Sequence, residues 1–131
     1  QEMVSDVYSA CTVCFIPLKK GIIGNSVPSK AALLMACGRP VVNYVDSDSY
    51  YYEEFSKNKI GISASCENYT ESVEAIKYLF DNPDEREKMG KAAKKYCLQR
   101  YTSKNNVDLY LALFSKLADR PLEENRNGLQ G

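Results

Sequence analysis

The stretch that decides the fold is residues 27–45, which read VPSKAALLMACGRPVVNYV. Pro28 and Ser29 are typical of a helix start, and Gly38 suits a left-handed residue just after a helix end. We therefore expect a helix with Ser29 as its N-cap that ends at Cys37-Gly38. Residues 40–45 are mostly apolar and β-branched, which predicts a buried strand. A helix that leads directly into such a strand is the repeating unit of an α/β protein.

The same alternation continues on both sides of this stretch. Upstream, the pattern predicts a helix over residues 2–10 and a short strand over residues 12–17. Downstream, a polar turn at residues 46–49 leads into a short aromatic helix and then a strand over residues 59–62. This order predicts a parallel sheet flanked by helices. Three strands are too few for a complete doubly wound sheet. We therefore expect a partial Rossmann-like sheet whose remaining strands lie outside this chain.

The second half of the chain is predicted to be helical. Asn68 and Glu71 have the spacing of a capping box, and Pro83 suits the first position of a further helix. A last apolar stripe predicts a third helix. The end of the chain is polar and rich in Glu and Asn. We therefore expect one domain over residues 1–120 and a disordered tail over residues 121–131.

Composition excludes several classes of function. Seventeen basic residues balance seventeen acidic ones, and a nucleic-acid-binding protein usually has a clear basic excess. Nucleic acid is therefore not an expected partner. The chain has no histidine, which excludes Ser-His-Asp and Cys-His catalysis and His-ligated zinc. It also has no run of 18 apolar residues, so we expect no membrane-spanning segment.

Five cysteines bear on metal binding and on the cellular compartment. The first two, Cys11 and Cys14, have the CxxC spacing of a redox or metal pair. Alternation along a strand would place them on opposite faces, and no second CxxC completes a zinc site. We favour buried free thiols over a redox pair, predict no metal site, and expect a reducing, cytoplasmic location. The other three are Cys37, Cys66 and Cys97.

The residues between the first two strands are the best candidates for ligand binding. In an open parallel sheet, ligands bind beyond the carboxyl ends of the strands. The first-turn N–H groups of Ser29, Lys30 and Ala31 would be unpaired donors at the positive end of a helix. A phosphate would accept from them, with the Lys30 ammonium and the Ser29 hydroxyl adding to the site. The spacing is not that of a P-loop. The alternative is an ordinary capped helix with an exposed lysine.

The helix–strand unit also carries a resemblance to a known family. Residues 28–30 and 35–42 follow the pattern P-S-K … M-A-x-G-[KR]-P-V-[VI]. This pattern resembles the donor-binding segment of GT-B glycosyltransferases. The chain is most similar to the large retaining family that builds bacterial capsule and exopolysaccharide. Residues 6–18 resemble the helix and strand that precede this segment in the family, and parts of residues 60–90 match its closing helices. The resemblance extends over about residues 2–117.

The resemblance implies a fold, a reaction and a set of site residues. The chain would be the C-terminal part of a nucleotide-sugar-binding domain whose N-terminal acceptor domain is missing. The reaction would transfer a sugar, with retention and without an obligatory metal or cofactor, from a UDP-linked donor to a saccharide or lipid-linked acceptor. No catalytic residue is assigned. The implied residues are Ser29, Lys30 and Ala31 at the donor diphosphate, Gly24, Asn25 and Ser26 near the donor sugar, and Asp46 and Ser49 at the border of the cleft.

Two positions depart from the family pattern. Many members have two glutamates eight positions apart, one on the donor sugar and one on the ribose, and these fall at Asn25 and Leu33. Asn25 can still hydrogen-bond a sugar hydroxyl, whereas Leu33 cannot hold a ribose. Two hypotheses follow. One is a fragment of a glycosyltransferase for cell-surface polysaccharide or glycolipid, inactive alone. The alternative is a non-catalytic Rossmann-like binding or assembly module derived from such an enzyme.

Three further features leave alternatives open. The tyrosines at 50–52 suit either stacking on a base or sugar or half-buried helix packing, and we favour packing. The lysines between residues 88 and 95 suit either contact with anionic lipid, which would place the protein at the inner face of a membrane, or a solvated helix face, which we favour. The apolar stripe over residues 107–117 either docks the missing N-terminal domain or covers this chain's own sheet.

Overall fold

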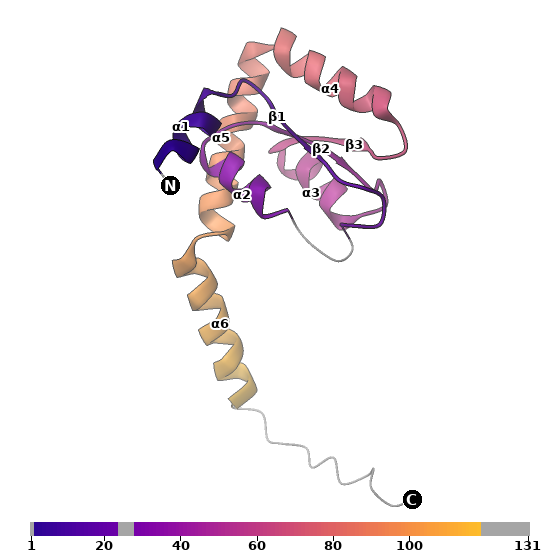
Figure 1. The fold of residues 1–131 in the computed structure, drawn as a ribbon. Helices are drawn as coiled ribbons and strands as arrows, with labels where there is room; N and C mark the ends of the chain where they lie inside the picture. The colour runs from indigo at the N-terminus through magenta and orange to yellow at the C-terminus, as the bar shows by residue number, and fades with distance from the viewer. Residues whose placement is uncertain (1, 24–27, 119–131) are drawn as a thin grey trace, which may run out of the picture.

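A three-stranded parallel sheet forms the centre of the chain. The computed structural model describes residues 2–23 and 28–118, and the strands are β1 (Cys14–Pro17), β2 (Val41–Val45) and β3 (Gly61–Ser65). The order is β1-β2-β3, so β2 is central. Cys14 lies opposite Val41, and Val41 lies opposite Gly61. The α/β class and the parallel sheet expected from the sequence are confirmed (Figure 1).

The third strand lies further along the chain than the pattern predicted. We expected residues 59–62, but Lys59 adopts a left-handed conformation with φ 52° at the end of the preceding helix, and the strand begins only at Gly61. Ser63, Ala64 and Ser65 then continue the strand as buried residues. Small and polar side chains hid this half of the strand, because sequence patterns identify buried strands by large apolar residues.

In the part of the chain that the structure describes, six helices surround or extend from the sheet. Three of them precede strands and three follow the last strand, as the alternation predicted. The bounds are α1 (Glu2–Ala10), α2 (Ser29–Ala36), α3 (Tyr50–Asn58), α4 (Tyr69–Asp81), α5 (Pro83–Arg100) and α6 (Ser103–Ala118).

The two faces of the sheet are covered by different helices. Successive side chains of a strand point to opposite faces, so Val41 and Val45 share one face and Val42 points to the other. The first face packs against buried residues of α2, α3 and α5. The second face packs against Ala75 and Leu79 of α4. Figure 1 shows α4 on one side of the strands and α2 and α3 on the other.

Two glycines join the end of α2 to the middle of α5. Gly38, which follows α2, has a left-handed φ of +69°, a conformation that favours glycine. A Cβ on Gly90 would lie 2.2 Å from the Gly38 carbonyl oxygen, so the two backbones meet directly. Both glycines belong to the pieces of sequence that carry the family resemblance. This contact gives them a packing role.

Two of the three predicted helix-start signals are confirmed. Asn68 caps α4, since its side chain accepts from the Thr70 N–H. Ser49, for which the sequence indicated only a polar turn, caps α3 in the same way, with the Tyr52 N–H as donor. Pro83 is the first residue of α5. The prediction of Ser29 as an N-cap is wrong. Ser29 is already helical, the N-cap is the extended residue Pro28, and no side chain among the described residues caps α2.

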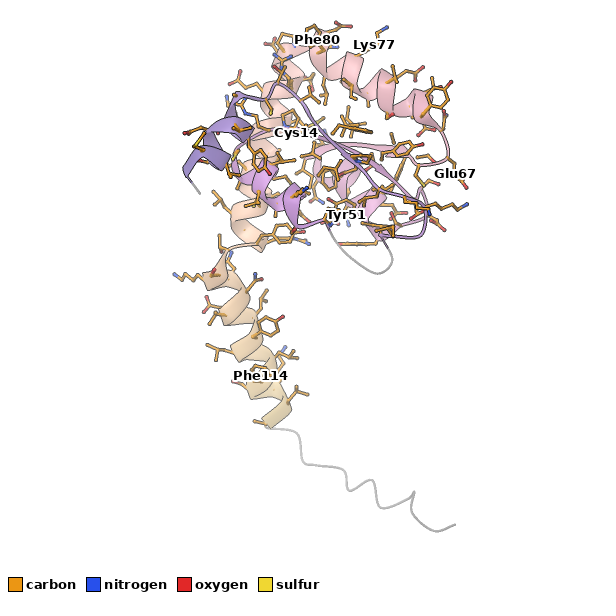
Figure 2. The ribbon with its side chains drawn as sticks, in the orientation of Figure 1. Cys14, Tyr51, Glu67, Lys77, Phe80 and Phe114 are labelled. Carbon is orange, nitrogen blue, oxygen red and sulfur yellow. The ribbon has the colours of Figure 1, made fainter. Side chains whose placement is uncertain are left out.

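The last helix, α6, has no buried residue and extends away from the sheet. Figure 2 shows Phe114 on this helix, well separated from the strands, and its side chain is 60% exposed. The interpretation that α6 covers this chain's own sheet is therefore wrong. No helix among residues 2–23 and 28–118 is long and apolar enough to cross a membrane. The predicted tail over residues 121–131 lies outside the described residues.

Candidate functional site

The candidate site lies where the carboxyl ends of the strands meet the first turns of α2 and α3. Ser29 and Lys30 are exposed at the start of α2, whereas Ala31 is 1% exposed and packs into the core. The burial of Ala31 anchors the first turn of α2. The serine hydroxyl and the lysine ammonium are thus presented to solvent at the positive end of a helix.

The first turn of α2 offers fewer free donors than the sequence suggested. The Ala31 N–H donates to the Pro28 carbonyl oxygen over 3.1 Å, so the prediction that it is unpaired is wrong. The reason is that the chain tightens into a three-residue turn as it enters the helix. Within the described residues, the N–H groups of Ser29 and Lys30 have no acceptor. The structure therefore brings together two backbone donors, one hydroxyl and one ammonium.

Asp46, at the end of β2, fastens the loop that follows β1. Its two carboxylate oxygens accept from the Gly21 N–H over 3.1 and 2.9 Å. The Cys66 thiol donates to the same carboxylate over 3.4 Å. Burial, together with this hydrogen bond, raises the pKa of Cys66. In the same loop, Lys20 pairs with Glu67 beyond β3. Through these bonds, Asp46 fixes the conformation of the loop that follows β1.

Ser49 has a similar scaffolding role at the start of α3. Its hydroxyl donates to the Asp46 carbonyl oxygen over 2.6 Å and accepts from the Tyr52 N–H over 3.2 Å. Asp46 directly follows β2 and Ser49 directly precedes α3, so both lie at the carboxyl edge of the sheet. Their place at the border of a donor cleft stays a prediction. Their side chains are engaged with the protein itself in this structure.

Three of the predicted residues lie outside the described part of the chain. These are Gly24, Asn25 and Ser26, expected near the donor sugar. Leu33, at the position where the resemblance implies a second glutamate, lies on α2 and is 53% exposed. The apolar side chain at this position therefore faces solvent and is not required by the core.

The structure reveals a cluster that the sequence did not indicate. Glu54 on α3 is 6% exposed, and its carboxylate accepts from the Tyr96 hydroxyl. Arg100, the last residue of α5, lies with Nη1 3.3 Å from Glu54 Oε1 and with its guanidinium carbon 5.0 Å from the centre of the Tyr96 ring. The hydrogen bond from Tyr96, supported by Tyr50 and Arg100, lowers the pKa of Glu54. Glu54 and Tyr96 lie 42 residues apart in the sequence, so no local motif indicates this cluster.

Two further buried polar groups lie in the core of the described residues. Tyr51 is 7% exposed and packs against Phe55, with ring centres 4.9 Å apart, which supports the packing interpretation for this tyrosine. Its hydroxyl has no hydrogen-bond partner among the described residues, and neither has the side-chain amide of Asn43 on β2. Figure 2 shows Tyr51 inside the body of the protein, and its burial raises its pKa. Tyr50, in contrast, is 71% exposed.

The cysteines are free thiols, as predicted. Cys14 is buried on β1, and burial together with the neighbouring Cys11 raises its pKa to about 11. A thiol with such a pKa stays protonated at neutral pH and is a poor nucleophile and metal ligand. In the part of the chain that the structure describes, no group of three or more metal-binding side chains occurs.

The lysines of α5 form pairs along their own helix. Lys88 lies 2.8 Å from Glu85, and Lys91 lies 2.5 Å from Glu87. These pairs at helical spacing offset part of the positive charge. They favour the interpretation of a solvated helix face over that of a lipid-binding one.

Comparison with known proteins places the chain in a family. Neither the curated proteins nor the solved structures contain a match to it. A family model described as glycosyl transferase-like matches residues 1–112, which is most of the 131-residue chain. The matched range includes the whole sheet and the candidate site. The chain therefore belongs to the glycosyl transferase-like family.

Proposed function

We propose that the first turn of α2 binds the diphosphate of a nucleotide-sugar, and that the chain is the donor-side part of a retaining GT-B glycosyltransferase. Family membership supports glycosyl transfer. The observation that carries the proposal is the exposure of Ser29 and Lys30 at the start of a helix, at the carboxyl edge of a parallel sheet. Oriented N–H groups and an ammonium at this position suit a phosphate.

The proposed chemistry rests on position and charge. The backbone donors of the first turn and Lys30 would stabilise the negative charge that develops on the leaving diphosphate as the glycosidic bond to the donor breaks. The helix start would also hold the sugar in line for attack by the acceptor. We propose a UDP-linked donor, a saccharide or lipid-linked acceptor of a cell-surface polysaccharide or glycolipid, and a cytoplasmic location.

A titration followed by backbone-amide NMR tests the binding step. UDP is added to the full-length protein, with GDP and ADP as comparisons. We expect localised shifts at Ser29, Lys30 and Ala31 with one nucleotide. The same spectra of a Lys30→Ala variant should shift less at equal ligand concentration. A well-dispersed spectrum in which none of the three nucleotides moves these amides would contradict the proposal.

Leu33 favours a second candidate function, that of a non-catalytic binding or assembly module. Its exposed side chain stands where many members of the family have a glutamate that holds the ribose. The two functions separate in the full-length protein carrying both Ser29→Ala and Lys30→Ala. Loss of sugar transfer would support the enzyme, and an unchanged biological role would support the module. Lys95→Ala, an exposed lysine on α5, is the control.

A further inference from the structure

Arg100 combines an exposed charge with a fixed position. Its side chain is 55% exposed, while its guanidinium contacts Glu54 and lies over the Tyr96 ring. A guanidinium has five N–H donors. Within residues 2–23 and 28–118, these contacts occupy only part of them, so the exposed side of Arg100 keeps donors for an anion.

Glu54 and Tyr96 contact the Arg100 guanidinium on its buried side and fix its position. Glu54 is nearly fully buried, and its carboxylate is fixed by the Tyr96 hydroxyl before Arg100 is counted. Tyr96 itself is 8% exposed. A buried carboxylate that is already hydrogen-bonded orients an arginine without enclosing it, and such support is typical of side chains that are held ready for a ligand.

The fold places Arg100 at the carboxyl edge of the sheet. Near the end of α5, the Cys97 thiol donates to the Ala32 carbonyl oxygen over 3.2 Å, so this part of α5 packs on the beginning of α2. Glu54, which contacts Arg100, is the fifth residue of α3, the helix that Ser49 caps. Figure 1 shows the C-terminal end of α5 beside α2. The guanidinium therefore lies by the N-terminal halves of both helices.

We propose that Arg100 is a second cation, beside Lys30, that contacts the diphosphate of the nucleotide-sugar donor, and that Glu54 and Tyr96 position it. This inference rests on the proposed function. An arginine suits the task because its planar fork binds two phosphate oxygens at once, whereas a lysine acts as a point charge. The pair would hold the diphosphate from two sides, with Lys30 on α2 and Arg100 on α5.

Calorimetric titration of the full-length protein with UDP, uridine and inorganic diphosphate tests the inference. Arg100→Gln should weaken UDP and diphosphate binding about tenfold, because a hydrogen bond to a charged group is lost. Uridine binding should not change, since uridine has no phosphate. Arg100→Lys keeps the charge beside Glu54 but loses the fork, and it should weaken UDP about threefold. It also serves as the second variant if Arg100→Gln does not fold. Lys95→Gln is the matched control on α5 and should bind UDP normally.

A double-mutant cycle separates positioning from general stability. Glu54→Gln alone should weaken UDP binding, and it should have no further effect once Arg100 is already Gln. A purely structural role of Glu54 would weaken binding in both backgrounds and would overturn the positioning claim.

The outcomes distinguish this inference from the function on which it rests. If Lys30→Ala weakens UDP but Arg100→Gln does not, the inference is wrong and the proposed function stands. If Arg100→Gln weakens UDP and uridine equally, the diphosphate contact is wrong. If the wild-type protein binds none of UDP, GDP and ADP, the proposed function is wrong and the inference fails with it.

Discussion

The two ends of α2, a helix of eight residues, differ in packing, exposure and capping. Just beyond the C-terminal end, the backbone of Gly38 contacts the backbone of Gly90, which leaves no room for a methyl group on Gly90. At the N-terminal end, Ser29 and Lys30 project into solvent, and no side chain caps the helix. Both ends belong to the same recurring family pattern. One sequence motif can therefore contain both residues that pack inside the protein and residues that are exposed to a ligand.

The largest effect is expected at the packed end. Gly90→Ala would place a Cβ 2.2 Å from the Gly38 carbonyl oxygen, and both partners are backbone, so α5 must move away from α2. We expect a loss of about 3 kcal/mol in the free energy of unfolding. Chemical denaturation followed by circular dichroism measures it. The neighbouring exposed variant Lys91→Ala should change stability by less than about 0.5 kcal/mol. A Gly90→Ala variant as stable as wild type would show that the two ends of α2 do not differ in packing.

The Glu54 cluster carries the next largest effect. Glu54→Gln removes the charge that accepts from Tyr96 and faces Arg100, and we expect a loss of about 1–2 kcal/mol at neutral pH. Because Arg100 is more than half exposed, most of this loss comes from the buried hydrogen bond. Thermal unfolding at pH 7 measures it. A Lys57→Gln variant on the same helix, whose side chain is exposed, is the control.

The lowered pKa of Glu54 also predicts how the stability of the protein depends on pH. The hydrogen bonds of its carboxylate lower the pKa of Glu54 in the folded protein below the usual value of 4.5. The stability it contributes is therefore complete above the unfolded pKa and is lost as the pH falls through the lower, folded one. Between about pH 5 and pH 3, the wild-type protein should lose more stability than Glu54→Gln does. Parallel curves for the two proteins would contradict the lowered pKa.

Much of the fold followed from the sequence, because helix starts and apolar strands leave local signals. Asn68 and Pro83 act at helix starts through their own side chain or ring, so their spacing was sufficient. The sequence did not reveal β3 in full, because Ser63 and Ser65 are buried without being apolar. It also missed the Glu54–Arg100 pair, because only tertiary packing brings α3 and α5 together.

The site was less predictable than the fold for a related reason. Asp46 and Ser49 were expected at the border of a cleft and do lie at the carboxyl edge, yet their side chains bond to this protein's own backbone. Sequence spacing predicts where such residues lie but not which groups they hydrogen-bond. Ser29 was expected to act as a cap and does not, because Pro28 already supplies the extended residue before the helix.

Two serine variants compare the helix starts directly. Ser49→Ala removes a cap that bonds the Tyr52 N–H and the Asp46 carbonyl oxygen, and we expect a loss of about 1 kcal/mol in stability. Ser29→Ala removes no such bond and should change stability by less than about 0.5 kcal/mol. In the binding assay the order should reverse, with Ser29→Ala weakening UDP and Ser49→Ala having a smaller effect. Equal loss of stability in the two variants would mean that Ser29 has a structural bond after all.

Leu33→Glu is expected to have the smallest effect on stability, and it tests where the ribose of the nucleotide binds. The leucine side chain is half exposed on α2, four residues beyond Ser29, so Leu33→Glu should change the free energy of unfolding by less than about 0.5 kcal/mol. A carboxylate there would supply the acceptor that a ribose hydroxyl needs, and we expect UDP to bind about tenfold more tightly. Leu33→Gln is the matched control, because it adds a polar group without a charge and should gain less. If Leu33→Glu instead weakens UDP binding, the added charge repels the diphosphate and the ribose does not reach this position. The nucleotide would then lie nearer Arg100 than the family pattern implies.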